Sequence, residues 1–312
     1  MCDTVFLLSH EIKDEWGKVR RMIKLFFLAA ILFLITACGD RSTIAPPVDI
    51  SPTPEVNIQL PVLDIAYIPE EDMENMPFEI YAIKGTAPAI SGARLERMSA
   101  WREEAAVLAE KYREIVYINK NPAYNTVYLT FDDGPDPVNT VSVINTLIEY
   151  GVSGTFFFTG ENIRRHPNVV KKAYEAGFPI GLHGYAHASF LTLTEDEIIA
   201  ELNESNDLLE QITGARSTIM RPPFGAIGDR EIEIIHSLGL TIYLWSLDTL
   251  DWAQTEAAEI LRNVEEYLRP GEIILMHAFS GQARSAAILP RIIEFILEQG
   301  YEIKALQPSP SP

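Results

Sequence analysis

From residue 126 onward, two patterns of apolar and polar residues recur along the chain. Short apolar runs bounded by Gly, Pro or Asn are typical of buried strands. Between these runs, apolar residues recur at three- and four-residue intervals, which predicts amphipathic helices. The predicted strands are Thr126–Phe131, Gly154–Phe158, Pro179–His183, Ser217–Met220, Leu240–Ser246, Glu272–His277 and Tyr301–Leu306.

The predicted helices carry start and stop signals. Thr194-Glu195-Asp196-Glu197 matches a capping box, in which a Thr hydroxyl and a Glu carboxylate satisfy the first backbone N–H groups of a helix. Glycine commonly follows the last helical turn because it adopts a left-handed conformation easily. The helices are therefore expected to stop at Gly151, Gly177, Gly214, Gly239 and Gly300.

Strands that alternate with helices imply parallel pairing through right-handed crossovers. The order of elements therefore predicts an α/β fold that curls into a closed or nearly closed barrel. In such a barrel, chemistry collects at the carboxyl ends of the strands.

The chain before this region has a different pattern. Residues 61–125 form a less regular lead-in segment. Within it, residues 93–116 have helical spacing, which predicts a helix that packs on the main domain and carries no chemistry. Its expected apolar stripe consists of Leu95, Met98, Trp101, Ala105, Leu108 and Tyr112.

The N-terminal 38 residues have the pattern of an export signal. Residues 23–37 form a short apolar run that follows basic residues and ends in Ala37-Cys38. This run suits a signal-peptide core better than a membrane-spanning helix, which needs about 20 apolar residues. Small residues followed by Cys resemble a bacterial lipobox, which would make Cys38 the lipidated first residue. A cleaved signal with an incidental Cys, or an uncleaved anchor, is the alternative.

The segments that flank the folded region are short of core-forming residues. Residues 1–21 contain acids that fit poorly in a signal, so Met22 is a candidate start. Residues 39–60 are rich in Pro, Ser and Thr and are expected to form an extended tether. The Pro-Ser tail at 307–312 is expected to fray.

Charge and cysteine content exclude several classes of protein. The net charge of −19 and pI of about 4.7 argue against a nucleic-acid binder, which normally presents a basic face. The chain has only two cysteines, Cys2 and Cys38, and both lie before the predicted barrel. Neither a disulfide framework nor a cysteine-ligated metal is therefore expected in the barrel.

Acidic, imidazole and guanidinium groups follow the predicted strands. Each has an ordinary alternative explanation: a turn for Asp132-Asp133-Gly134-Pro135, a surface charge for Arg221, a core role for His277 and helix capping for Asp248 and Asp251. Their occurrence at the ends of several strands favours one shared site. The full set is Asp132, Asp133, His183, His187, Arg221, Asp248, Asp251 and His277.

A carboxylate with two imidazoles is a ligand set suited to zinc, and it leaves a coordination position for water. A second carboxylate beside the metal can act as a base, and a separate His can act as an acid. Such a set is typical of hydrolases that attack amide or ester carbonyls.

Together these motifs resemble the polysaccharide deacetylases of carbohydrate esterase family 4, which have a NodB-type domain. The resemblance covers residues 126–306 and implies a distorted seven-stranded (β/α) barrel. It rests on motifs that include Asp132-Asp133-Gly134-Pro135, His183-Gly184-Tyr185-Ala186-His187, Arg221-Pro222-Pro223-Phe224-Gly225, Asp248-Thr249-Leu250-Asp251-Trp252 and Leu275-Met276-His277.

The resemblance implies a role for each matching residue. Asp133, His183 and His187 correspond to the metal ligands, with zinc expected and cobalt or nickel as alternatives. Asp132 corresponds to the general base and Arg221 to the residue that holds it.

The remaining positions correspond to the acid and the pocket. His277 is the expected general acid, oriented by Asp251, with Asp248 as the competing candidate. The backbone N–H of Phe224, where the family usually has Tyr, is expected to bind the oxyanion. Trp252 and Leu275 are expected to wall the acetyl pocket, although a core role explains them equally well.

Three further positions depart from the family pattern. Leu182 and Gly184 flank the first metal His where Asn and Ser or Thr are common, and Ala188 replaces a common Pro. Because the flanking hydroxyl more often supports the site than ligates the metal, the metal site is expected to survive.

The expected function is deacetylation of N-acetylated sugars in a cell-envelope polysaccharide, with peptidoglycan N-acetylglucosamine as the leading substrate. Alternatives within the family are deacetylation of O-acetyl-xylan or of chitooligosaccharides. A non-catalytic, glycan-binding lipoprotein is the alternative from another class. The protein is expected to be a lipid-anchored, extracytoplasmic monomer.

Overall fold

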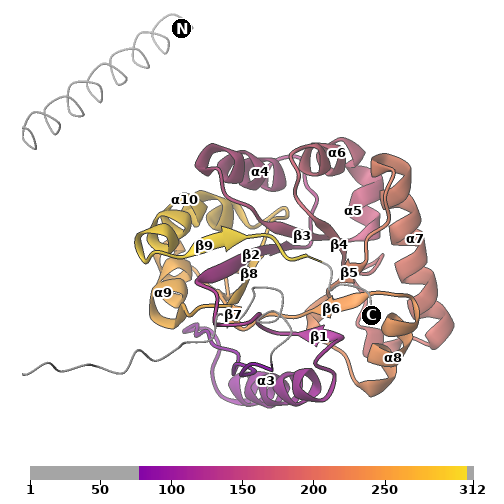
Figure 1. Cartoon of the computed structure of the whole chain (residues 1–312), viewed down its shortest axis with the longest axis horizontal. Coiled ribbons are helices and arrows are strands. Elements are labelled where there is room, and N and C mark those ends of the chain that lie inside the picture. The colour runs from indigo at the N-terminus through magenta and orange to yellow at the C-terminus, as the bar shows by residue number, and fades with distance from the viewer. Residues whose placement is uncertain (1–76, 308–312) are drawn as a thin grey trace, which may run out of the picture. The chain divides into compact units, whose positions relative to one another are not determined.

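The computed structural model describes residues 77–307 (Figure 1). The predicted signal, lipobox and tether, residues 61–76 of the lead-in segment and residues 308–312 of the tail lie outside the described residues.

The strands form one parallel sheet, which confirms the predicted barrel-type α/β fold. The order along the sheet is β1-β6-β5-β4-β3-β2-β8-β7, and β9 pairs with the first residues of β2. The strands are β1 (Val116–Tyr117), β2 (Thr126–Asp132), β3 (Thr155–Phe158), β4 (Ile180–Leu182), β5 (Ile219–Met220), β6 (Thr241–Tyr243), β7 (Leu247–Asp248), β8 (Ile273–His277) and β9 (Glu302–Lys304).

Helices surround the sheet on its outer side, and α3 lies beside β1 and β7 (Figure 1). The α-helices are α3 (Ala93–Lys111), α4 (Asn139–Tyr150), α5 (Gly160–Arg165), α6 (Pro167–Glu175), α7 (Glu195–Thr213), α8 (Asp229–Ser237), α9 (Ala257–Tyr267) and α10 (Ala283–Glu298). Two short 3-10 turns are η1 (Phe190–Thr192) and η2 (Pro223–Gly225).

Every strand predicted from the sequence contains a strand in the structure. β1 and β7 were not predicted, because strands of two residues are too short to show an alternation. The sheet therefore takes in residues 116–117, which lie before the expected start of the barrel at 126.

The helix ends follow the predicted signals. The Thr194 hydroxyl accepts the Glu197 N–H, and the Glu197 carboxylate accepts the Thr194 N–H, so the capping box at the start of α7 is confirmed. Gly214 ends that helix with φ of 79°, and Gly151 ends α4 with φ of 65°. Both angles are left-handed, which is the conformation that glycine adopts at little cost.

The helix predicted over residues 93–116 is shorter than expected. α3 ends at Lys111, and Ala105, Leu108 and Ala109 are its buried residues. Leu95 was expected on the apolar stripe but is 44% exposed. The stripe therefore contacts the barrel mainly along the second half of the helix. In the first half, Met98 and Trp101 are partly buried.

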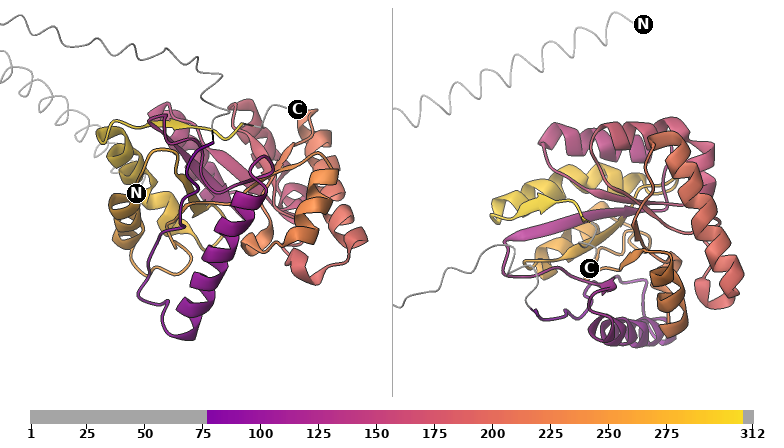
Figure 2. Two further views of the ribbon diagram at one scale, coloured as in Figure 1. Left: turned by 60° about the horizontal axis from the view of Figure 1, so that its bottom comes forward. Right: turned by 45° about the vertical axis from the view of Figure 1, so that its right-hand side comes forward.

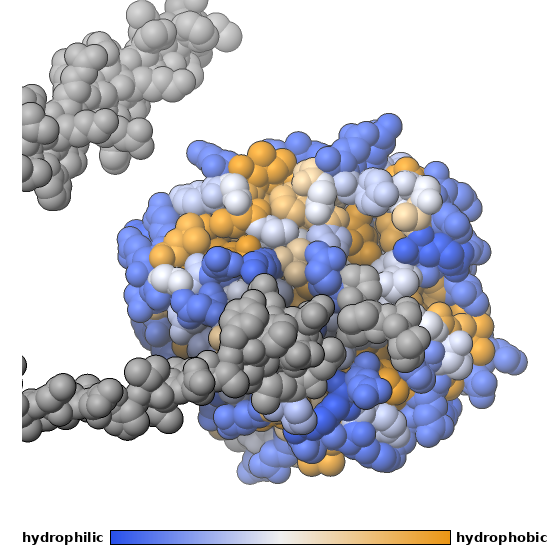
Figure 3. Space-filling view, in the orientation of Figure 1, coloured by the Kyte–Doolittle hydropathy of each residue, from blue (hydrophilic) through white to orange (hydrophobic). Residues whose placement is uncertain are grey.

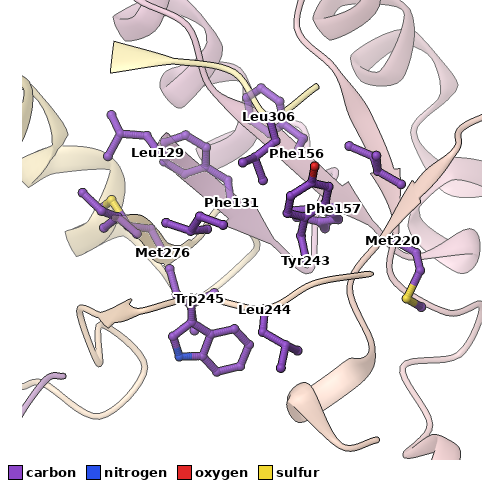
Figure 4. Close-up of a cluster of buried hydrophobic side chains, with 14 of the residues drawn as sticks. Leu129, Phe131, Phe156, Phe157, Met220, Tyr243, Leu244, Trp245, Met276 and Leu306 are labelled. Carbon is purple, nitrogen blue, oxygen red and sulfur yellow. The ribbon is translucent and has the colours of Figure 1, made fainter. Parts of the chain in front are cut away.

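The core fills the inside of the barrel and the space between sheet and helices. Its side chains come from strands that are distant in sequence, such as Leu129 and Phe131 of β2 and Met276 of β8 (Figure 4). Phe156 stacks on Phe131, with ring centroids 5.3 Å apart. The inside of the barrel is filled as well, because the Arg221 guanidinium lies over the Phe157 ring, 4.3 Å from its centre. The interior is therefore a packed core and not a channel, so the ligand site must lie at an end of the strands.

A segment N-terminal to the barrel connects the two ends of the sheet. The Lys84 N–H donates to the Ser246 carbonyl, and the Lys84 carbonyl accepts the Asp248 N–H, both at 2.8 Å. The Tyr81 N–H donates to Asn119 Oδ1 at 2.9 Å, two residues beyond β1. The segment and α3 run along this side of the molecule (Figure 2).

The outer surface is hydrophilic around the rim, where the exposed faces of the helices lie (Figure 3). Between residues 77 and 307, none of the helices has both the length and the apolar composition needed to cross a bilayer.

Candidate active site

The predicted site residues come together at the carboxyl ends of the strands. Asp132 of β2 is paired in register with His277, the last residue of the neighbouring strand β8. His183 and Arg221 directly follow the last residues of β4 and β5. Because all these strands are parallel, their ends lie at the same end of the barrel.

Asp133, His183 and His187 form a three-sided cluster. Asp133 Oδ1 lies 3.2 Å from His183 Nε2 and 3.0 Å from His187 Nε2. One ligand atom from each residue lies within 4.8 Å of the other two. Burial acts to raise the pKa of Asp133, but the two imidazoles outweigh it and hold that pKa well below its usual range. The carboxylate is therefore ionised, as a metal ligand must be.

The cluster fits a divalent ion. Asp133 Oδ1 is buried and makes no hydrogen bond of good geometry, although two imidazole nitrogens face it. His183 Nδ1 lies 2.7 Å from the Arg221 carbonyl, which can only accept, so Nδ1 donates. That bond leaves the His183 Nε2 lone pair directed at Asp133, which is the tautomer that a metal ligand needs.

Asp132 is held by a buried guanidinium. Arg221 is fully buried, and its Nη1 donates to Asp132 Oδ1 at 2.7 Å and to Thr130 Oγ1 at 2.8 Å. Its other nitrogens donate to the carbonyl oxygens of Tyr243 and Leu244. With its N–H groups partnered, Arg221 fixes the position of the Asp132 carboxylate.

His277 is held by Asp251. The His277 Nδ1–H donates to Asp251 Oδ1 at 2.7 Å, and the His277 backbone N–H donates to Oδ2 at 2.8 Å. Burial acts to lower the pKa of His277, but the charge and hydrogen bond of Asp251 outweigh burial and raise that pKa to about 10. His277 is therefore protonated at neutral pH.

The geometry separates the two candidates for the orienting acid. Asp248 Oδ1 accepts the Leu250 backbone N–H at 2.9 Å instead of contacting His277. Burial raises the pKa of Asp248 to about 6. Asp251 and not Asp248 is therefore the carboxylate bonded to His277, and Asp248 stabilises the turn that leads to Asp251.

The remaining predicted residues lie around these groups. The Phe224 ring packs edge-on against His187, with centroids 4.5 Å apart, and the side chain is otherwise exposed. Trp252 is 39% exposed, which fits a pocket wall better than a core position. Leu275 is buried, which fits either role.

Left-handed backbone is concentrated in the loops of the site. Among the described residues, the non-glycine residues with positive φ are Asp133, His187, Phe224 and Leu250, with φ between 53° and 69°. Such a conformation costs non-glycine residues of order 1 kcal/mol or more, so the surrounding contacts must maintain it. Gly184, where the family commonly has Ser or Thr, also has a positive φ of 68°.

Three supporting residues were not identified from the sequence. Glu201 of α7 accepts the backbone N–H groups of Tyr185 and Ala186, between the two metal-cluster histidines. Ser285 of α10 donates to Asp251 Oδ2 at 2.6 Å. Thr130 accepts a hydrogen bond from Arg221. One indication of this contact was present in the sequence, because Thr130 lies two residues before Asp132 and therefore on the same face of the strand.

Comparisons with known proteins agree with this geometry. Residues 119–243 match the family model described as polysaccharide deacetylase. A peptidoglycan-N-acetylmuramic acid deacetylase of Bacillus subtilis, PdaA, is 32% identical over 64% of this chain and 76% of its own length. The chain belongs to the polysaccharide deacetylase family.

Other family members match over different shares of their length. A peptidoglycan-N-acetylglucosamine deacetylase of Bacillus cereus is 36% identical over 50% of this chain and 56% of its own length. B. subtilis PdaC, a peptidoglycan-N-acetylmuramic acid deacetylase, is 30% identical over 59% of this chain and 38% of its own length. The chain thus spans only about two fifths to just over half of these two relatives.

Solved structures of the family share the fold. A crystallised peptidoglycan N-acetylglucosamine deacetylase superposes with a TM-score of 0.61 and 30% identity, over 64% of this chain and 94% of that chain. A family 4 carbohydrate esterase from Streptomyces lividans, in complex with acetate, superposes with a TM-score of 0.54 and 27% identity, over 58% of this chain and 92% of that chain.

Proposed function

We propose that this protein is a metal-dependent deacetylase of an N-acetylated cell-envelope polysaccharide, with peptidoglycan N-acetylglucosamine as its substrate. The observation that carries the proposal is the meeting of the Asp133-His183-His187 cluster, the Asp132–Arg221 pair and the Asp251–His277 pair at one end of the barrel. The names of the related proteins support the choice of peptidoglycan.

Asp133, His183 and His187 are the residues that would hold the metal ion. When bound there, a divalent ion polarises the acetamido carbonyl and lowers the pKa of a water molecule. One carboxylate and two imidazoles favour zinc, with cobalt or nickel as alternatives.

Asp132 is the general base in this scheme. Arg221 holds it in place, and Asp132 takes the proton of the water that attacks the acetamido carbon. The backbone N–H of Phe224 donates to the oxyanion that develops; the loss of one such donor typically costs about 3 kcal/mol of transition-state stabilisation.

His277 is the general acid. Its Nδ1–H is used by Asp251, so the Nε2–H is the proton available to the leaving nitrogen. As the carbon–nitrogen bond breaks, His277 protonates that nitrogen, and acetate and a free amino sugar are released. The raised pKa keeps this proton in place at neutral pH.

The decisive experiment measures acetate release from acetylated peptidoglycan, chitooligosaccharide and acetyl-xylan, before and after chelation and after zinc, cobalt or nickel is added back. We expect metal-dependent acetate release with a new free amine, most of it from peptidoglycan. A new free hydroxyl instead of an amine would identify an O-acetyl esterase. Saccharide binding without acetate release from any of the three would contradict the enzyme proposal and identify a glycan-binding protein.

We further propose the organisation expected from the sequence. Residues 1–38 direct export, Cys38 carries the lipid, residues 39–60 form the tether, and residues 126–306 form the catalytic domain of an extracytoplasmic monomer. The Cys38→Ala variant is expected to lose labelling by a radioactive fatty acid and to leave the membrane fraction. Unchanged labelling and fractionation would contradict the lipid anchor.

A further inference from the structure

α3 lies against two loops of the active site, although it precedes the residues that match the family model. Trp101 Nε1 donates to the Gly225 carbonyl at 3.0 Å, directly after Phe224. Met98 packs on a small cluster that includes Leu250, one residue before Asp251. The helix therefore forms one side of the surroundings of the site, instead of packing away from it.

The first turn of α3 carries a guanidinium to the pocket wall. The Arg94 guanidinium carbon lies 5.0 Å from the ring centre of Trp252. Trp252 is 39% exposed and directly follows Asp251, which holds the general acid. Arg94 is exposed as well, so both side chains are accessible to a glycan that enters the site.

The charge of Arg94 has no acidic partner in the described part of the chain. Within residues 77–307 it forms no ion pair with a carboxylate, although the whole chain contains 44 acidic residues and has a net charge of −19. Stacking on an indole uses the flat face of a guanidinium and leaves its N–H groups at the edge. Those N–H groups match the two oxygens of a carboxylate.

We propose that Arg94, stacked on Trp252, binds a carboxylate on a sugar next to the one that is deacetylated. Arg94 is then a specificity-determining residue that favours carboxylate-bearing N-acetylated glycans over neutral ones. This inference rests on the proposed function, because it assigns the sugar to the same site. The lactyl group of a muramic acid without a stem peptide is a free carboxylate and supplies this chemistry, whereas an N-acetylated chitooligosaccharide has no carboxylate.

The test compares two forms of one glycan. A soluble peptidoglycan fragment with free lactyl carboxylates is compared with the same fragment after its carboxyl groups are converted to methyl amides. Binding is measured by isothermal titration calorimetry in the Asp132→Asn background, and kcat/KM for acetate release is measured without that substitution. The variants are Arg94→Gln, which removes the charge, Arg94→Lys, which keeps it, and Arg97→Gln as an exposed control on the same helix.

We expect Arg94→Gln to weaken binding of the carboxylate form by about tenfold, to lower its kcat/KM similarly, and to leave the amide form within about twofold. Arg94→Lys should retain part of the preference, and Arg97→Gln should retain all of it. If Arg94→Gln weakened binding of both forms equally, Arg94 would only contribute packing, and the inference would be wrong. Unchanged binding of both forms would also overturn it. Because binding does not require turnover, failure of the deacetylase proposal would appear separately, as absence of acetate from the unsubstituted protein.

Discussion

Two neighbouring carboxylates have different surroundings and therefore different chemistry. Asp132 pairs with the buried Arg221 guanidinium, while Asp133 faces the imidazoles of His183 and His187. A guanidinium has no lone pair for a metal, so Asp132, the carboxylate that Arg221 holds, remains available to take a proton. Imidazoles can share a metal with a carboxylate, so Asp133 is the one placed for ligation.

Asp132→Asn is expected to lower kcat for acetate release by at least about 100-fold, because the amide cannot accept the proton of the attacking water. Glycan binding should persist, since the change keeps the size and shape of the side chain. Calorimetric titration with glycan measures binding, and Asp207→Asn, on the exposed face of α7, is a matched control. Turnover that survives in Asp132→Asn would mean that another group is the base.

Asp251→Asn is expected to shift the basic limb of the kcat/KM profile to lower pH by about two units, because the carboxylate that raises the pKa of His277 to about 10 is lost while burial remains. Ser285→Ala removes one hydrogen bond to Asp251 but keeps its charge, so it should shift the same limb much less. The pH dependence of acetate release measures both. A basic limb that does not move in Asp251→Asn would contradict the assignment of His277 as the acid.

At the scale of elements, helices hold the loops that carry the site. The loop between His183 and His187 has a left-handed residue at Gly184 and another at His187, and α7 holds it through Glu201. The spacing of the two histidines alone does not place their nitrogens together. The helix contact fixes the loop in the conformation that does.

Glu201→Gln is expected to weaken zinc binding by about 10- to 100-fold, because the carboxylate that accepts two backbone N–H groups of the histidine loop is lost. Competition with a chromogenic chelator measures the affinity. Asp207→Asn, on the same helix but paired with Arg216, should leave zinc affinity unchanged. Equal affinities of the Glu201 variant and the unsubstituted protein would show that the loop holds its shape without Glu201.

Glu272, just before β8, should make stability depend on pH. Burial raises its pKa from 4.5 to about 7, against the lowering effects of Ser246 and Arg269. Between pH 4.5 and 7 the unfolded chain is deprotonated there while the folded chain keeps the proton, so the unfolding free energy falls as pH rises, by up to about 3 kcal/mol.

Glu272→Gln cannot lose a proton, so its unfolding free energy should fall less over this range of pH. The pKa of Asp248 is also raised, to about 6, and Asp248 is unchanged in this variant. Part of the dependence of the unfolding free energy on pH should therefore remain. Urea unfolding at several pH values between 4.5 and 7.5 measures the difference. Parallel pH curves for the variant and the unsubstituted protein would show that Glu272 does not titrate in this range.

At the scale of the whole molecule, the sequence predicts the barrel because its signals are local. Apolar runs, the Thr194 capping box and the glycines after helices depend on near neighbours, and all predicted strands are found. The motif residues could be assigned to one site because parallel strands place their carboxyl ends together.

The features that were not predicted depend on contacts between distant segments. β7 is two residues long and is recognisable as a strand only through its pairing with β8 and Lys84. Ser285 lies 34 residues from Asp251, and nothing in its local sequence indicates that contact. For the same reason, the contact between Arg94 of α3 and Trp252, which lie far apart in the sequence, could not be predicted.

The central claim is that Asp133, His183 and His187 share one divalent ion. A crystal of the zinc-loaded protein, with diffraction recorded on both sides of the zinc absorption edge, tests it most directly. We predict a single strong anomalous peak per chain, within bonding distance of one Asp133 oxygen and of Nε2 of both histidines. A peak bound elsewhere, or no peak between these three side chains in crystals that contain zinc, would contradict the account.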